Sequence, residues 1–390
     1  MLSLIIVSHE IAWLVDDVRD GLTHRYYGLY SNLARYVLGH GGTVFWYTAK
    51  ECKLLTFDLN TYISSSTYSM FIAMVKALRA SLTYGRPVIV LLDYPHSFLG
   101  AKHLMDYILT LLLFHVLRLV KRIYVVVDNM DPPIEHAIEL KGGINLLQRL
   151  LWILLNNIIF GFDLIVFHSQ SYRVYHKLYY RLDYSKSVVI PPGSFPEVIQ
   201  YEDPPSNPPI RIFCSGKITE WVGLERLMKI VKKLKNRGIM VKFILIDRSA
   251  PTDLEQEDIK IIRTYIGYKD FIKTLAKAHL LLLTRPNSLH HLLTVRASLA
   301  DYLMAGRPVL YLHSLGMREI VGNIDGVFEF RILDEVPEII LKLINDKNSL
   351  KKLSQKVRAF AERHLKYKVL ALKLLREILT NLRQKLLHNT

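Results

Sequence analysis

The chain has 390 residues, of which 51% are hydrophobic and 11% are aromatic. This length predicts two or three domains, and this composition excludes an intrinsically disordered or collagen-like chain. The formal net charge is +16. Cys52 and Cys214, the two cysteines, are too few for a disulfide framework or a cysteine-rich zinc site, so we expect an intracellular protein in a reducing compartment.

In the first half, short apolar runs alternate with longer helical patterns. Such runs are typical of parallel strands that are buried on both faces and joined by crossover helices. The predicted strands are residues 4–8, 43–48, 87–93, 123–128, 164–168 and 187–190, and the predicted helices are residues 26–38, 68–82, 99–119, 145–159 and 171–181. The first ten residues lack a basic region and a cleavage site, so we interpret them as a strand and not as a signal peptide.

A proline-rich segment follows, with seven of the fifteen prolines between positions 191 and 209. Proline can continue neither a helix nor a central strand. We therefore predict an N-terminal domain at residues 1–195, a linker at 196–209 and a C-terminal domain at 210–365.

The second half repeats the alternation of strands and helices. The predicted strands are residues 210–215, 241–246, 259–262, 279–283 and 308–311, and the predicted helices are residues 224–237, 268–276, 293–304, 336–344 and 350–364. A basic helix at residues 366–390 is expected to cross back to the N-terminal domain. The predicted fold class is α/β, with two Rossmann-like doubly wound parallel sheets that face each other across a cleft, where ligands bind beyond the carboxyl ends of the strands.

The positive charge is concentrated in the second half. Residues 1–200 contain 18 Lys and Arg against 15 Asp and Glu, whereas residues 201–390 contain 33 against 20. A basic surface attracts the phosphates of nucleotides, nucleic acids or lipid headgroups. Charge alone does not choose among these three partners.

Several common motifs are absent from the sequence. No G-x-G-x-x-G follows the first strand, the pair Gly216-Lys217 lacks the rest of a P-loop, and there is no H-E-x-x-H. A dinucleotide cofactor is therefore not favoured, and we expect neither a cofactor nor a metal ion.

The run Ser215-Gly216-Lys217 ends the predicted strand at 210–215. Small residues at a strand end let the backbone approach an anion, and a lysine adds a positive charge. We interpret this run as a phosphate site; the alternative is an ordinary turn with a surface lysine.

Seven segments together resemble the GT-B glycosyltransferases, in particular the large retaining family that forms α-linked glycans. They are GHGGTV at 39–44, FDLIVFHS at 162–169, VVIPPG at 188–193, TYIGY at 264–268, AHLLLLTRPNS at 278–288, DYLMAGRPV at 301–309 and GMREIV at 316–321. Their order and spacing span nearly the whole chain. The resemblance implies an enzyme that uses a nucleotide-diphosphate sugar as its donor and no metal ion, in agreement with the lack of a D-x-D motif.

The resemblance also implies roles for single residues. Asp301 would accept hydrogen bonds from the ribose hydroxyls, and Gly267 and Tyr268 would contact the base. Ser215, Gly216, Lys217 and Arg296 would bind the diphosphate. Gly316 and Glu319 would face the sugar, with Glu319 as a catalytic carboxylate. Alternatives are a solvent-facing helix carboxylate for Asp301, a surface aromatic for Tyr268 and a helix cap for Glu319. The sequence departs from the family pattern at Leu293, where a glutamate is usual, and at Ser298, where a lysine is usual, so an inactive relative stays an alternative.

In the first half, Gly21, His24 and Arg25 precede a predicted helix and are expected to face the cleft on the acceptor side. Asp128 and Asp131 end a predicted strand, and either carboxylate could orient or deprotonate the acceptor hydroxyl. The alternative for both is a cap on the following helix.

The predicted function is sugar transfer, retaining and metal-independent, to a hydroxyl of a glycan, a lipid-linked sugar or a glycoprotein. The alternatives are a nucleotide-sugar 2-epimerase on the same architecture and a basic nucleic-acid-binding protein without enzyme activity. We expect a cytoplasmic protein in peripheral contact with an anionic membrane, because apolar segments with basic borders occur at residues 99–122 and 143–162 and the last helix is basic. Ordinary crossover helices packed on a sheet are the alternative for each segment.

Overall fold

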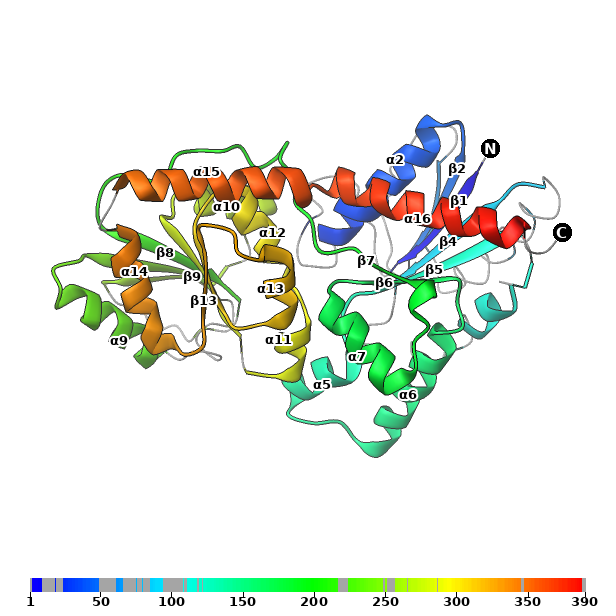
Figure 1. Cartoon of the computed structure of the whole chain (residues 1–390), viewed down its shortest axis with the longest axis horizontal. Coiled ribbons are helices and arrows are strands. Elements are labelled where there is room, and N and C mark those ends of the chain that lie inside the picture. The colour runs from blue at the N-terminus through cyan, green and yellow to red at the C-terminus, as the bar shows by residue number, and fades with distance from the viewer. Residues whose placement is uncertain are drawn as a thin grey trace. The chain divides into compact units, whose positions relative to one another are not determined.

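The computed structural model describes residues 2–8, 18, 24–48, 61–65, 75, 79, 85–93, 108, 111–117, 119–120, 122–216, 224–247, 250, 257–264, 266–285, 287–344 and 347–387. The predicted helix at 68–82 and much of that at 99–119 lie outside these residues. The chain divides into two compact units, of which unit 1 comprises Met1–Pro191 with Tyr367–Thr390 and unit 2 comprises Pro192–Lys366 (Figure 1).

Unit 1 contains a parallel seven-stranded sheet in the order β3-β2-β1-β4-β5-β6-β7. The strands are β1 (Ser3–Ser8), β2 (Thr43–Thr48), β3 (Thr61–Ser65), β4 (Val88–Asp93), β5 (Ile123–Asn129), β6 (Leu164–Phe167) and β7 (Ser187–Val189). Every residue of β1, β4, β5 and β6 is buried, which explains their unbroken apolar runs, because helices cover both faces of such a sheet.

The helices of unit 1 follow their strands as crossovers. They are η2 (Tyr26–Tyr30), α2 (Ser31–Gly39), α5 (Pro133–Lys141), α6 (Leu146–Ile159), α7 (Gln170–Tyr180) and the short η3 (Tyr184–Lys186), and the last helix of the chain, α16 (Tyr367–Leu387), belongs to this unit too. Helix α16 lies beside α2 (Figure 1). Its Lys385 Nζ lies 2.9 Å from Asp163 Oδ1.

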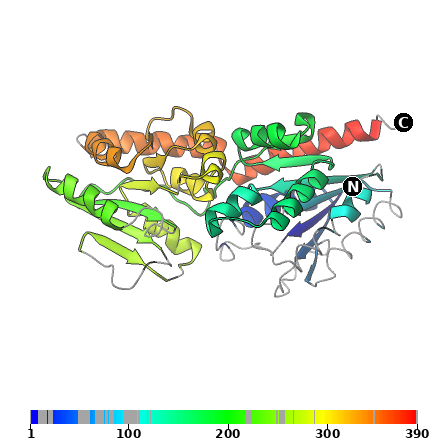
Figure 2. The same ribbon diagram turned by 90° about the horizontal axis from the view of Figure 1, so that it is seen from below.

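Unit 2 contains a parallel six-stranded sheet in the order β10-β9-β8-β11-β12-β13. The strands are β8 (Ile210–Ser215), β9 (Val241–Ile246), β10 (Ile259–Ile262), β11 (Leu280–Leu283), β12 (Val309–Leu312) and β13 (Val327–Phe330). The helices are α9 (Leu224–Lys235), α10 (Tyr268–Ala276), α11 (Leu289–Leu293), α12 (Ala297–Met304), α13 (Leu315–Val321), η4 (Leu333–Glu335), α14 (Val336–Ile344) and α15 (Lys347–His364). Figure 2 shows helices on both faces of each sheet. The two predicted doubly wound sheets of Rossmann type are confirmed.

Residues 192–209, which include the predicted linker, pack within unit 2. Phe195 and Ile199 are buried, and Arg358 donates a hydrogen bond of 2.7 Å to the Ile199 carbonyl. Arg307, completely buried, donates to the Glu202 carbonyl at 2.7 Å. The prolines prevent regular structure here, but these contacts still hold the segment against helices α12 and α15.

The predicted helix at residues 293–304 is wrong as a single element. Helix α11 ends at Leu293 and α12 begins at Ala297. Between them, the cap residues Thr294 and Arg296 have extended backbone conformations. The hydroxyl of Thr294 donates to the His290 carbonyl at 2.8 Å and so caps α11. Thr294 and Val295 are β-branched, which disfavours helix. Strands β3 and β13 and helices α5, α11 and α13 were not among the predicted elements.

His176 of α7 is buried among aromatic rings of unit 1. Its ring lies 4.6 Å from that of Tyr172 and 5.0 Å from that of Tyr180, and neither ring nitrogen has a hydrogen-bond partner. Burial lowers the pKa of His176 to about 3. The imidazole of His176 is therefore neutral in the folded protein at neutral and mildly acidic pH.

We expect acid to destabilise unit 1 through His176. Below pH 6.5 the unfolded chain binds a proton that the buried imidazole cannot bind, so the free energy of unfolding falls as the pH decreases from 6.5 towards 3. This contribution reaches about 2 kcal/mol at pH 5. Urea unfolding measures the fall in the free energy of unfolding between pH 7.5 and pH 5. This fall should be about 2 kcal/mol smaller for His176→Leu than for the wild type. For His40→Gln, at an exposed position, it should equal that of the wild type. Equal losses for His176→Leu and the wild type would contradict the prediction.

Candidate functional site

Each sheet has one point at which the strand order reverses. In unit 2 this switch point lies between β8 and β11, and in unit 1 it lies between β1 and β4. The crossover helices leave in opposite directions there, so a crevice opens at the carboxyl ends of these strands. Strand topology alone therefore selects the end of β8 and the end of β11 as the place to look for a ligand site in unit 2.

Gly216 follows β8 directly at this switch point. Its φ angle is +117°, a conformation that residues with a side chain rarely adopt. Its amide donates a hydrogen bond of 3.0 Å to the Ile246 carbonyl at the end of β9. Ser215 and Gly216 thus lie at the carboxyl end of β8 beside the switch point, and their contact with a phosphate stays a prediction. Lys217 and Gly21 lie outside the described residues.

Arg296 joins the two strands of the switch point. One terminal nitrogen donates to the Thr284 carbonyl after β11 at 3.0 Å, and the other donates to the Ser215 carbonyl at 3.1 Å. The break between α11 and α12 makes this possible, because Arg296 is the extended residue that precedes α12. The side chain is partly exposed, so a guanidinium cation stands at the carboxyl edge of the sheet beside the first residues of α12.

Two hydroxyl groups accompany Arg296. Ser215 Oγ lies 2.9 Å from the hydroxyl of Tyr302, which is fully buried and whose pKa is raised mainly by that burial. Thr284 is also buried, and its Oγ1 has no hydrogen-bond partner among the residues that the structure describes. A buried hydroxyl without a partner is uncommon and usually indicates water or a ligand. Sequence reasoning did not assign Thr284, although its place at the end of the run Leu280 to Leu283 was visible.

Asp301 lies in the interior of unit 2. Its Oδ1 accepts hydrogen bonds from Ser194 at 2.6 Å and from Tyr268 at 2.7 Å, and its exposed fraction is 3%. Tyr268 is itself buried and its ring meets that of Phe195 edge-on. The carboxylate therefore joins α12 to the start of α10 and to the segment after Pro192. The ribose contact of Asp301 and the base contact of Tyr268 stay predictions.

Three further predicted donor-side residues differ in their surroundings. Gly267 is the exposed N-cap of α10, and a Cβ there would meet open space. Gly316 and Glu319, which the resemblance places at the sugar, both lie in helix α13. Gly316 is buried, and a Cβ would come within 2.6 Å of the Leu293 carbonyl oxygen. Glu319 is exposed, and α13 approaches the end of α11 closely at Gly316.

In unit 1, Asp128 and Arg25 form a buried ion pair at the carboxyl end of β5. Arg25 donates from Nε to Asp128 Oδ2 at 2.5 Å and from a terminal nitrogen to Oδ1 at 2.8 Å. The Tyr30 hydroxyl donates to Oδ2 at 3.0 Å. Burial lowers the pKa of Arg25, but the attraction of Asp128 outweighs this and the net shift is upward. Both oxygens of Asp128 are engaged, so its geometry suits a positioning residue.

The remaining predicted residues of unit 1 lie near this pair. His24 Nδ1 lies 3.0 Å from the hydroxyl of Tyr367, the first residue of α16. His24 is 3% exposed and Arg25 is 1% exposed, so neither presents its side chain to solvent for an acceptor. Asp131 is partly exposed and precedes α5, whose N-cap is Pro132. Of the two predicted catalytic aspartates, Asp131 is the accessible one.

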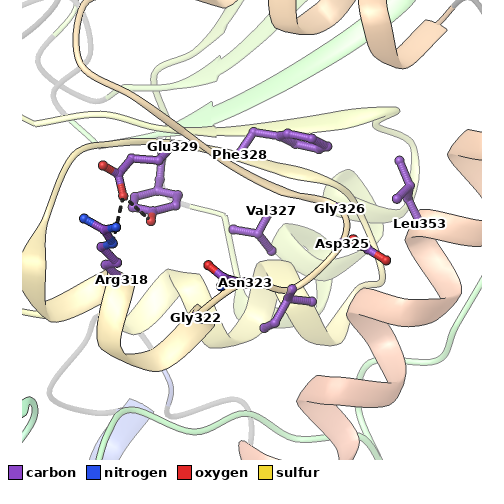
Figure 3. A pocket seen from close by; sticks show the side chains of 11 residues that line it. Arg318, Gly322, Asn323, Asp325, Gly326, Val327, Phe328, Glu329 and Leu353 are labelled. Atoms are coloured by element: carbon purple, nitrogen blue, oxygen red, sulfur yellow. Dashed lines mark hydrogen bonds and ion pairs between the residues drawn. The ribbon is translucent and has the colours of Figure 1, made fainter.

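A hollow of about 490 Å³ lies elsewhere in unit 2 (Figure 3). Its lining includes Arg318, Asn323 and Glu329, and the Arg318 and Glu329 side chains approach each other to 4.0 Å. The loop that borders it joins the end of α13 to the start of β13, and so lies at the amino edge of the sheet. It contains none of the predicted site residues, and we do not assign the donor to it.

Solved structures of glycosyltransferases share this fold. Sucrose-phosphate synthase from Thermosynechococcus elongatus superposes with a TM-score of 0.63 at 12% identity, over 100% of both chains. A glycosyltransferase from Rickettsia africae gives 0.63 at 14% identity over 98% of both chains. HepE from Anabaena, solved in complex with UDP, gives 0.61 at 11% identity over 97% of this chain and 100% of its own.

No protein-family model matches the sequence, and no curated protein matches it either. At these identities the structural likeness is a statement about the fold. The chain has the GT-B fold of these glycosyltransferases, with one Rossmann-like sheet in each unit. Among the described residues, no helix is long and apolar enough to cross a membrane.

Proposed function

We propose that the protein is a glycosyltransferase that moves a sugar from a nucleotide-diphosphate sugar to a hydroxyl group of a glycan, a lipid-linked sugar or a glycoprotein. The GT-B fold supports this proposal, as do relatives in fold that were solved with UDP. Transfer leaves negative charge on the departing diphosphate, and an enzyme accelerates it by placing positive groups where that charge develops.

The observation that carries the proposal is the position of Arg296. Its guanidinium bridges the Ser215 and Thr284 carbonyls at the switch point of unit 2, beside the positive-φ Gly216 and the unsatisfied hydroxyl of Thr284. A guanidinium can bind phosphate oxygens in a bidentate manner. We assign the diphosphate to Arg296 and the hydroxyl of Thr284, beside Ser215 and Gly216, with Lys217 as a second cation.

We further propose that the transfer retains the configuration of the sugar and needs no metal ion, so that cations of this chain neutralise the leaving diphosphate. Asp131 is our candidate for the group that orients the acceptor hydroxyl. Asp128 is assigned a positioning role through Arg25, and Glu319 stays a candidate for the donor sugar. Hydrolysis of the donor sugar should then be unaffected by excess EDTA, and its loss in EDTA would overturn the metal-free assignment.

Nucleotide binding tests the proposal. Calorimetry with UDP, GDP, ADP and dTDP should give binding of at least one diphosphate by the wild type. Arg296→Gln should weaken it about 10- to 100-fold, since a charge-assisted hydrogen bond contributes about 1.5–3 kcal/mol. Arg383→Gln, on the exposed face of α16, is the matched control and should bind as the wild type. Failure of all four diphosphates to bind would reject the proposal.

One observation favours a second candidate function, the binding of a nucleic acid. Helix α9 exposes Arg226, Lys229, Lys232 and Lys233, and the structure gives none of these four an ion-pair partner among the described residues. A row of cations on one helix binds phosphate backbones without sequence preference. Labelled oligonucleotides should then bind with a steep salt dependence that is lost when the four residues are changed to glutamine.

We also propose that the protein works in the cytoplasm in contact with the inner face of the membrane. The excess of Lys and Arg over Asp and Glu supports attraction to anionic lipids. Net charge does not specify which part of the surface makes this contact.

A further inference from the structure

Helix α6 presents an apolar face to solvent. Leu146, Leu147, Leu150 and Leu154 have exposed fractions of 72%, 68%, 54% and 50%. At 100° per residue these four positions lie within about 100° of one another around the helix. We call them the leucine face. Single exposed leucines are ordinary on a protein surface, but four on one face of one helix are not.

The opposite face of α6 is buried in unit 1. Trp152, Leu155 and Ile159 are at most 5% exposed. The helix is therefore apolar on both faces, a pattern that is typical of a helix with protein or lipid on both sides. Unit 1 covers one side only, so the leucine face lacks the apolar partner that its composition requires.

Helices α5 and α7 flank α6 and also expose apolar side chains. Phe160, the C-cap of α6, meets the ring of His176 of α7, and Tyr175 of α7 donates a hydrogen bond to Glu135 of α5. All three helices lie together at one end of unit 1 (Figure 1). Ile138 of α5 and Leu178 and Tyr179 of α7 are exposed.

The charged residues of α6 and α7 are all positive, whereas α5 also carries Glu135 and Glu139. Residues 141–186 contain six cations, Lys141, Arg149, Arg173, Lys177, Arg181 and Lys186, and two acids, Asp163 and Asp183. Asp163 pairs with Lys385 at 2.9 Å, whereas Asp183 is exposed and accepts a hydrogen bond of 2.9 Å from the amide of Ser185. Arg149 is exposed on α6 itself and Lys177 is exposed on α7. A partner that covers this region has to accept leucines and complement positive charge.

We propose that α6 lies in the interface of an anionic lipid bilayer, with the leucine face among the acyl chains and the exposed cations Arg149, Lys177 and Arg181 at the headgroups. An amphipathic helix with basic residues beside an apolar face binds in this manner. The helix has 14 residues, whereas a span needs about 20, so it would lie in the interface and not cross. A second copy of this chain is the less favoured occupant, because a two-fold contact through α6 would bring the two Arg149 side chains together.

Vesicle co-sedimentation without nucleotide tests the proposal independently of the proposed enzyme activity. The probes are vesicles of phosphatidylcholine alone and vesicles with 3:7 phosphatidylglycerol to phosphatidylcholine. We expect the wild type to bind the anionic vesicles at least 10-fold more tightly than the neutral ones, and to bind less tightly as NaCl increases. The triple variant L146Q/L150Q/L154Q should lose at least 10-fold in affinity, whereas L289Q/I332Q/L387Q, which changes three apolar side chains exposed elsewhere, should bind as the wild type.

Two further measurements complete the test. Circular dichroism should show the same melting temperature for L146Q/L150Q/L154Q and the wild type, because the changed side chains are exposed, so a loss of vesicle binding would not reflect unfolding. Sedimentation equilibrium should show a monomer. Equal vesicle binding by the triple variant, no preference for anionic lipid, or a dimer that L146Q/L150Q/L154Q dissociates would each overturn the proposal, and the last would assign the leucine face to a second copy.

Discussion

Arg25→Met is expected to lower the free energy of unfolding of unit 1 by about 3–5 kcal/mol, because it leaves the carboxylate of Asp128 buried without its cation. Asp128 is completely buried, and it receives two hydrogen bonds from Arg25 and one from Tyr30. Arg25 also donates to the Ile190 carbonyl at 3.3 Å, so the loss affects the end of β7 as well. Urea unfolding at pH 7.5 measures the effect.

The control for this prediction is Arg35→Met on helix α2, where the side chain is exposed. A surface cation contributes little, so we expect a change of less than about 0.5 kcal/mol. The double variant Arg25→Met/Asp128→Leu should regain much of the stability, since a buried ion pair can be replaced by apolar side chains at small cost. If Arg25→Met were as mild as Arg35→Met, the pair would not be the structural element that we describe.

Gly28→Ala is expected to destabilise unit 1 by about 3 kcal/mol, at the upper end of the usual cost of overpacking. Gly28 is buried in η2, and a Cβ there would come within 2.1 Å of the ring of Tyr367. Tyr367 is the first residue of α16 and is 1% exposed. The missing side chain at position 28 is thus what allows the last helix of the chain to pack against the first crossover of unit 1.

Gly39→Ala on α2 is the matched control for Gly28→Ala. It is also a helical glycine, but a Cβ there meets nothing within 4 Å, so alanine should be neutral or slightly stabilising through its higher helix propensity. Thermal unfolding of both variants beside the wild type separates the two cases. Equal melting temperatures for Gly28→Ala and Gly39→Ala would show that the packing of α16 does not depend on Gly28.

Most strands of the fold were predictable, and the reason is their burial. Strands β1, β4, β5 and β6 are buried on both faces and therefore appear as unbroken apolar runs that few other structures allow. Strand β13, at the edge of the sheet, was not predicted, because Glu329 interrupts its short apolar run and its residues are only partly buried apart from Phe330. Helix α13 was missed for a similar reason, since seven residues show too little periodicity.

The candidate site was predictable in its position along the chain but not in its contacts. Ser215 and Gly216 lie at the end of the predicted strand 210–215 and Arg296 lies inside the predicted helix 293–304, and the structure brings the three to one edge of the sheet of unit 2. Arg296 reaches the Ser215 carbonyl only because the predicted helix at 293–304 is broken before Ala297. Thr284 could be recognised as a site residue only when its hydroxyl was seen to be buried without a partner.

Periodicity, proline placement and charge, all of which are local along the chain, thus determine the two α/β units, the order of their elements and the basic character of the second half. Asp128 contacts Arg25, which is 103 positions away, and Asp301 contacts Ser194, which is 107 positions away. Gly28 lies against Tyr367, which is more than 300 positions away. Pairings over such separations depend on how the elements pack, because many side chains of the right type compete for each place. Packing therefore decides which charged side chains are buried and paired and which helix faces are exposed to solvent.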